Sequence, residues 1–189
     1  VEFDEKNLEI TSVASEKATV ERITDKGGAR LGTFELMAEG IEIHNVEFYT
    51  PNTQIEMVVG ADDVTVRNVA VERPNSHGNP ALYTLDENGD NRETSGLVVF
   101  NNDFNGASVG ISPDQEVNVS QNDISNVGAE GIWFYSAVDG NEDIVLKGNE
   151  ISDYGTTAIK FQERAPNSVN SVSGEHKIAA EVSSSNDAD

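Results

Sequence analysis

The stretch IEIHNVEF, from Ile41 to Phe48, decides the fold, because four later stretches repeat its pattern. The other copies are VTVRNVAV (64–71), LVVFNNDF (97–104), VNVSQNDI (117–124) and IVLKGNEI (144–151). The first, third and eighth positions are apolar in all five copies. In a chain that is 37% apolar, chance gives all of these matches with a probability on the order of 10⁻⁷. The pattern is therefore a true repeat.

Each copy predicts a short strand followed by a bend. Apolar residues two apart lie on the same face of an extended chain, because its side chains alternate between faces. The fifth or sixth position of every copy is Asn: Asn45, Asn68, Asn101 with Asn102, Asn122 and Asn149. Asn tolerates the left-handed backbone conformation that a sharp bend requires. We therefore expect a bend between the opening strand and the last inward residue of each copy.

A second apolar pair follows each copy and predicts a second inward-facing strand. The pairs are Ile55 and Met57, Leu82 and Leu85, Val109 and Ile111, Ile132 and Phe134, and Ile159 and Phe161. Successive copies start 23, 33, 20 and 27 residues apart, a length typical of one solenoid turn with loops of variable size. The absence of a 3.6-residue period excludes helical repeats, and the variable spacing excludes a left-handed hexapeptide β-helix.

The pattern apolar-x-apolar-x-x-Asn-x-apolar resembles that of the right-handed parallel β-helices of the pectin-lyase-like superfamily. The resemblance covers residues 38–165 and implies an all-β, right-handed parallel β-helix, a solenoid of about six to seven short turns. Residues 1–37 fit the repeat poorly and are expected to form irregular turns or an N-terminal cap. Residues 166–189 are expected to form a C-terminal cap, with Ile178 and Val182 as apolar contacts, and a polar tail.

The charge of the chain limits its partners. A net charge of -22, with 34 acidic and 12 basic residues, excludes nucleic acid as a direct partner and disfavours an anionic membrane surface. It favours a halophilic source, because molar salt screens the repulsion between carboxylates; an ordinary acidic secreted protein is the alternative. The chain has no cysteine for disulfides, and no apolar run is long enough for a membrane span.

Two acidic loops are candidate cation sites. They contain Asp-x-Asn-x-Asp, at Asp86, Asn88 and Asp90 and again at Asp139, Asn141 and Asp143. Oxygen ligands at alternate positions are typical of calcium loops, although neither loop has the twelfth-position Glu of an EF-hand. The alternative is two solvated turns, since Asp and Asn are common in turns. We expect no cofactor other than Ca²⁺ or another cation bound weakly in these loops.

The outer face of the second strand is the candidate ligand surface. We expect Glu56, Tyr83, Gly110, Trp133 and Lys160 to point outward there, with Ser112, Tyr135 and Gln162 in a second row. Trp133 beside Tyr135 is a candidate stacking platform for a sugar ring, with Lys160 and Gln162 as polar partners. The alternative is that a loop or a neighbouring subunit covers Trp133, because exposed aromatic residues also mark interfaces.

Two hypotheses of function follow. The first is a non-enzymatic structural or receptor-binding module of a virion or cell surface, adapted to salt and able to bind glycans. The resemblance implies a homo-oligomer, a trimer, and the absence of a recognisable leader suits a virion protein assembled inside a cell. The second is a polysaccharide lyase or glycoside hydrolase that acts on an extracellular polysaccharide, with Asp114, Lys160 and Glu56 as catalytic candidates around Trp133.

Overall fold

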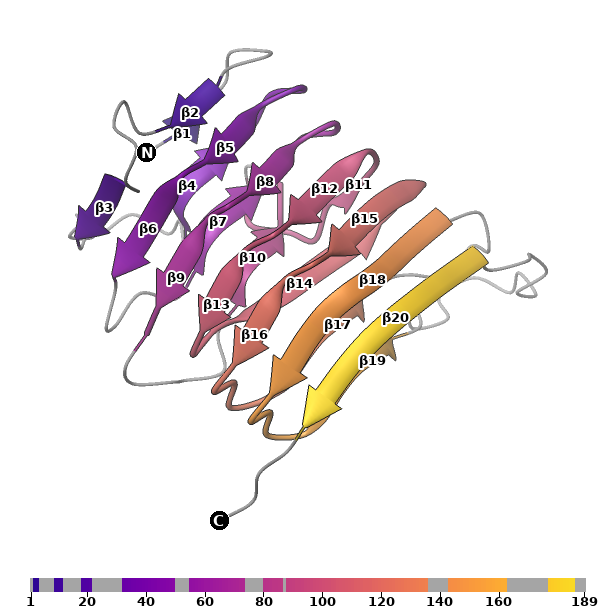
Figure 1. Cartoon of the computed structure of the whole chain (residues 1–189). Helices are drawn as coiled ribbons and strands as arrows, with labels where there is room; N and C mark the ends of the chain where they lie inside the picture. The colour runs from indigo at the N-terminus through magenta and orange to yellow at the C-terminus, as the bar shows by residue number, and fades with distance from the viewer. Residues whose placement is uncertain are drawn as a thin grey trace.

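The computed structural model describes residues 2–3, 9–11, 18–21, 32–49, 55–73, 80–86, 88–135, 143–162 and 177–185. Within these residues the protein is all-β, without helices, and every pairing between its named strands is parallel. The strands form two long sheets in which successive segments of the chain lie side by side (Figure 1). No helix in the described part is long and apolar enough to cross a membrane.

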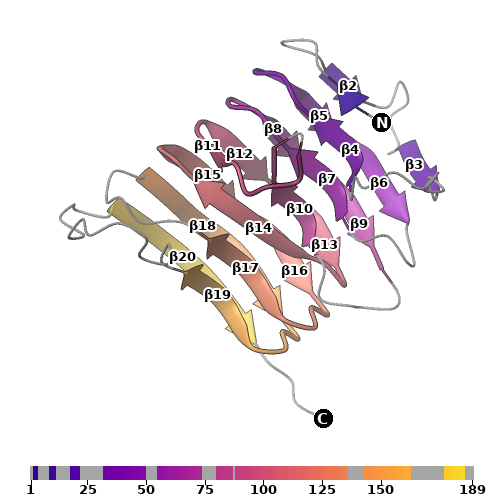
Figure 2. The ribbon, with the colours of Figure 1, turned by 180° about the vertical axis from the view of Figure 1, so that it is seen from behind.

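The first sheet has eight strands and contains the predicted second strands of the repeats (Figure 2). In spatial order its main path is β1 (Glu2–Phe3), β4 (Gly32–Leu36), β7 (Ile55–Val59), β10 (Pro80–Thr84), β14 (Ser108–Pro113), β17 (Glu130–Tyr135) and β19 (Thr157–Gln162). The short strand β11 (Glu93–Thr94) also pairs with β14.

The second sheet has twelve strands, and its two halves meet at the long strand β18 (Asp143–Ser152). The opening strands of the repeats form one half: β2 (Glu9–Thr11), β5 (Glu42–His44), β8 (Thr65–Arg67), β12 (Leu97–Phe100) and β15 (Glu116–Ser120). The ends of the repeats form the other half: β3 (Ala18–Glu21), β6 (Val46–Tyr49), β9 (Ala70–Glu72), β13 (Asp103–Asn105) and β16 (Asp123–Ser125). Strand β20 (Lys177–Ser185) pairs with β18 along both halves.

The predicted bend lies at the fifth position of the first four copies, whereas in the last copy β18 continues through the fifth position, Gly148. The fifth-position residue has a positive φ angle in all five copies: Asn45 at 56°, Asn68 at 51°, Asn101 at 54°, Gln121 at 56° and Gly148 at 62°. Asn and Gly are the residues that adopt this conformation at least cost. The prediction is confirmed for the three asparagines, whereas Asn122 and Asn149, at the sixth position, serve a different purpose.

These sixth-position residues form a buried ladder with Asn102 along the core. Asn102 Nδ2 donates to Asn122 Oδ1 at 2.9 Å, and Asn122 Nδ2 donates to Asn149 Oδ1 at 2.9 Å. Each side chain also donates to a backbone carbonyl of the copy before its own; for Asn102 this is Val66 O, at 3.0 Å. The ladder therefore ties together successive copies from inside.

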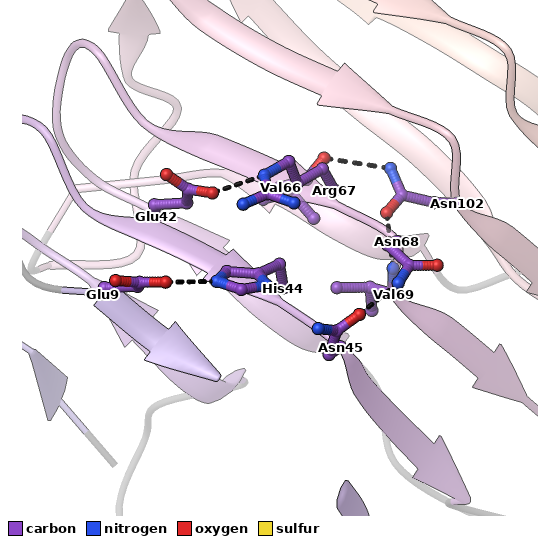
Figure 3. A network of polar contacts seen from close by, with 9 residues as sticks. All are labelled: Glu9, Glu42, His44, Asn45, Val66, Arg67, Asn68, Val69 and Asn102. Carbon is purple, nitrogen blue, oxygen red and sulfur yellow. Dashed lines mark hydrogen bonds and ion pairs between the residues drawn. The ribbon is translucent and has the colours of Figure 1, made fainter. Parts of the chain in front are cut away.

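A second set of polar contacts joins β2 and the first two copies of the repeat, as Figure 3 shows. His44 Nε2 lies 2.6 Å from Glu9 Oε1. Arg67 donates to Glu42, and Asn68 donates to the side chain of Asn45. The first two contacts join paired strands, β2 with β5 and β5 with β8, and the third joins the bends that follow β5 and β8. All three contacts therefore reinforce the parallel register.

The core lies between the two sheets and contains the repeat positions that the sequence predicts. The first, third and eighth residues of all five copies are at most 3% exposed. A single apolar cluster contains residues of both sheets, and the rings of Phe34 and Phe48 meet edge to face at 5.2 Å within it. The inward assignment of the repeat is therefore confirmed.

Three of the predicted second pairs differ from the structure. In the last pair, Phe161 is 45% exposed instead of buried, although its ring stacks on that of Phe134 with centroids 5.0 Å apart. On β7, Met57 and Val59 belong to the main core, whereas Ile55 packs with Val58 and Leu85 in a separate small cluster. On β10, Leu82 is in the main core and Leu85 is not. The reason is that Leu85 lies three residues after Leu82, so the alternation of an extended chain places the two side chains on opposite faces. The Leu85 N–H still donates to Val59 O of β7 at 3.1 Å.

The terminal segments contribute strands to the same two sheets. Within residues 1–37, β1 and β4 continue the first sheet, while β2 and β3 continue the two halves of the second. Within residues 166–189, Ile178 pairs in register with Ile144 of β18, and Val182 pairs with Asn149. The predicted cap regions thus include strands that extend the regular pairing.

Candidate functional site

One row of residues crosses four adjacent strands on the outer face of the first sheet. Tyr83 pairs with Gly110, Gly110 with Trp133, and Trp133 with Lys160. This is the register that the repeat predicts. On β7, however, the residue opposite Tyr83 is Val58. The expectation that Glu56 belongs to this row is therefore wrong.

Three aromatic side chains gather on this row, and we call Tyr83, Trp133 and Tyr135 the aromatic cluster. Tyr83 and Tyr135 are stacked, with ring centroids 4.6 Å apart and planes 13° apart. The ring of Trp133 lies 5.2 Å from that of Tyr135 and 6.2 Å from that of Tyr83, tilted against both. Gly110 makes the arrangement possible, because a Cβ atom there would lie 2.4 Å from Cδ2 of Tyr83.

Tyr135 anchors the cluster and is itself inaccessible. It is 2% exposed, and its hydroxyl donates to the carbonyl oxygen of Thr84 at 2.5 Å and accepts from the Thr84 N–H at 3.1 Å. Burial raises the pKa of Tyr135 well above its ordinary value. The hydroxyl thus satisfies backbone groups at the point where β10 ends. Of the cluster, Tyr83 and Trp133 are the partly exposed members that a ligand can reach.

An ion pair borders the cluster at its β19 side. Lys160 Nζ donates to Glu130 Oε1 at 2.6 Å and lies 5.3 Å from the centroid of the Trp133 ring. The hydrogen bond from Lys160 holds the pKa of Glu130 below its ordinary value, so that carboxylate is ionised at neutral pH. Gln162, in register with Tyr135, is exposed at the end of β19. The Trp133 indole nitrogen Nε1 is buried and has no hydrogen-bond partner within the described part.

The three candidate catalytic residues lie apart. Glu56 is fully buried and forms a two-point ion pair with Arg73, whose Nε donates to Glu56 Oε1 at 2.8 Å. Asp114 is exposed in the turn after β14 and accepts a hydrogen bond from Ser95 Oγ at 3.1 Å. Strands β10, β14 and β17 separate Glu56 on β7 from Lys160 on β19. The structure therefore places only Lys160 beside Trp133.

The first candidate cation loop is ordered by its own hydrogen bonds. Asp86 Oδ1 accepts from the backbone N–H groups of Asn88 and Asp90, each at 2.9 Å. The bond from Asp90 is the main cause that lowers the pKa of Asp86. Across the described residues, no three acidic or histidine side chains converge to hold a metal ion. Asp139 and Asn141 lie outside the described residues, and Asp143 begins β18 opposite Glu116.

Sequence reasoning missed two features of this surface. Tyr83 was expected to face outward but was not recognised as part of the aromatic platform. Glu130 was missed as the partner of Lys160; its only signal is its place three residues before Trp133 on the same strand.

The chain matches no protein family model, no curated protein and no solved structure.

Proposed function

We propose that this chain is a right-handed parallel β-helix that serves as a non-enzymatic structural or receptor-binding module of a virion or cell surface. In this proposal it binds glycans through the aromatic cluster. The parallel sheets and the left-handed residue at each fifth position support the β-helix. The observation that carries the binding function is the row in which Tyr83, Trp133 and Lys160 meet on the outer face. Aromatic faces beside charged hydrogen-bonding groups suit a sugar ring.

The surroundings of the carboxylates favour binding over catalysis. Glycoside hydrolysis requires two carboxyl groups about 5 to 9.5 Å apart on either side of the scissile bond. Near Trp133, Glu130 is engaged by Lys160, while Glu56 is enclosed with Arg73 on a distant strand. A lyase or hydrolase is the alternative function, and release of reducing sugar from a polysaccharide would establish it.

Replacing Trp133 tests the binding surface. We expect Trp133→Ala to weaken binding to immobilised polysaccharides at least about tenfold, because it removes the largest ring of the platform. Phe100→Ala is the matched control, since Phe100 is 37% exposed on the outer face of the second sheet. Affinity is measured by surface plasmon resonance, and thermal unfolding checks that both variants are folded. Equal binding by both variants and the wild type would contradict the proposed site.

Salt adaptation is the second part of the proposal, and a column of carboxylates supports it. Asp103, Asp123 and Glu150 lie in register on the adjacent strands β13, β16 and β18, all exposed. Neighbouring strands are about 4.8 Å apart, so adjacent unit charges repel by about 0.9 kcal/mol in water. Molar salt shortens the screening length to about 3 Å and largely removes this repulsion. A halophilic source fits such a column.

The salt dependence of stability tests this adaptation. We expect the melting temperature to rise between 0.15 and 2 M NaCl. Asp123→Asn should stabilise the protein by about 1 kcal/mol at low salt and have little effect at 2 M, because it removes the middle charge of the column. Asp90→Asn, at an exposed loop position outside the column, is the control. If the melting temperatures of the wild type, Asp123→Asn and Asp90→Asn rose equally between 0.15 and 2 M NaCl, repulsion within the column would not explain the salt dependence.

The oligomeric state is also a proposal. We propose the homotrimer that the β-helix resemblance implies. Sedimentation equilibrium at 2 M NaCl measures it directly, and a monomer at micromolar concentration would contradict it.

A further inference from the structure

We propose that the aromatic cluster selects an uncharged glycan and discriminates against acidic polysaccharides. This inference rests on the proposed glycan-binding function and names the ligand class of the same surface. It follows from the platform, from the pairing of its cation and from the charge of the whole protein.

The platform offers apolar ring faces, and within the described residues the cation that contacts these rings, Lys160, is paired. Tyr83 and Trp133 are partly exposed, and the buried Tyr135 ring fixes Tyr83 by stacking against one of its faces. The C–H faces of a neutral pyranose can pack against such rings, and this contact requires no charge on the ligand. Gly110 leaves the space above β14 to these rings.

The cation next to the platform is already paired. Lys160 Nζ lies 2.6 Å from Glu130 Oε1, and its charge is further stabilised by the Trp133 ring at 5.3 Å. A carboxylate or sulfate on a ligand would have to share this ammonium group with the ionised Glu130, and the two anions would repel each other. A sugar hydroxyl both donates and accepts, so it can bind the carboxylate and the ammonium group without breaking their contact.

The field of the whole protein acts in the same direction. A net charge of -22 repels a polyanion during its approach, most strongly at low ionic strength. A neutral polysaccharide experiences no such barrier. The local ion pair and the long-range field therefore both favour an uncharged ligand.

The experiment compares two groups of immobilised polysaccharides at 0.15 and 2 M NaCl. The neutral group is glucan, galactan, mannan and xylan, and the acidic group is polygalacturonate and alginate. We expect the wild type to bind at least one neutral polysaccharide, and to bind it at least about tenfold more tightly than either acidic one at both salt concentrations.

Glu130→Gln tests the role of the ion pair directly. It leaves Lys160 without its anionic partner, so we expect acidic polysaccharides to bind about tenfold more tightly than to the wild type at 0.15 M NaCl. Glu150→Gln removes the same charge from the second sheet and controls for the change in net charge; it should cause no such gain. Thermal unfolding confirms that both variants are folded.

The outcomes separate this inference from the proposed function. Wild-type binding to acidic polysaccharides that equals or exceeds binding to neutral ones would overturn the inference and leave the glycan-binding function standing. An equal gain in Glu130→Gln and Glu150→Gln would overturn the role of the ion pair. Binding to neither group would overturn the proposed function itself, and the inference with it.

Discussion

Asn122→Ala should destabilise the protein by about 3 to 5 kcal/mol, because it interrupts the asparagine ladder at its middle member. The side chain of Asn122 is 1% exposed and makes four hydrogen bonds. It accepts from the backbone and side-chain nitrogens of Asn102 and donates to Val99 O and Asn149 Oδ1. Alanine leaves the buried Asn102 N–H without its partner, at a cost of about 1 to 3 kcal/mol. It also removes one hydrogen bond each from Asn102 Nδ2, Val99 O and Asn149 Oδ1.

The outward side chain of Asn118 on β15 provides the control. It is partly buried and accepts a single hydrogen bond from Ser120 Oγ at 2.7 Å. Asn118→Ala should therefore cost less than about 1 kcal/mol. The free energies of unfolding come from urea titrations of both variants in one buffer. If the two variants lost similar stability, the ladder would not contribute as we propose.

The ladder shows how far the repeat alone could be interpreted. The inward positions were predictable because side chains alternate with a period of two and a one-residue shift would expose the whole apolar set. The roles of the asparagines were not, since Asn suits both a left-handed bend and a buried hydrogen-bonded position. Gln121 and Gly148, the fifth residues of the last two copies, were the available signal that the two asparagine positions differ. They show that the left-handed residue belongs to the fifth position even where Asn occupies the sixth.

The candidate site likewise has features that the sequence could predict and features that it could not. The row from Tyr83 to Lys160 follows from in-register parallel pairing, so the spacing of the repeats could predict it. The burial of Tyr135 could not be predicted, because its hydroxyl binds Thr84 at the place where the longest repeat leaves the sheet. Such contacts with a non-repeating connection have no period in the sequence. The roles of the predicted ligand-binding residues remain predictions.

The burial of Glu56 also depends on a residue outside the repeat pattern. Its partner Arg73 directly follows β9, at the start of the connection from β9 to β10, outside the repeat pattern. The alternation of apolar residues does not predict a buried ion pair such as that of Glu56 and Arg73. An acidic residue on the outer face of a strand is ordinarily expected to be solvated. An arginine near the end of a repeat copy is a weak signal by itself.

Arg73→Met should destabilise the protein by about 3 to 5 kcal/mol, because it removes both hydrogen bonds of the arginine, and its charge, from the buried carboxylate of Glu56. The side chains of Glu56 and Arg73 are 0% and 3% exposed, so water cannot replace the lost ion pair. Arg73 Nη2 also donates to the carbonyl oxygen of Pro80 at 3.2 Å. Urea unfolding of the variant, compared with the wild type at neutral pH, measures the loss.

The double variant Glu56→Leu/Arg73→Met separates a buried charge from lost packing. Removing both charges should recover most of the stability, because well-packed apolar side chains often replace a buried ion pair at little cost. A double variant as unstable as Arg73→Met alone would show that the arginine acts mainly through packing. The pair also bears on the site, since Pro80 begins β10 and this strand carries Tyr83. Arg73→Met should therefore weaken glycan binding as well, whereas the double variant should retain more of it.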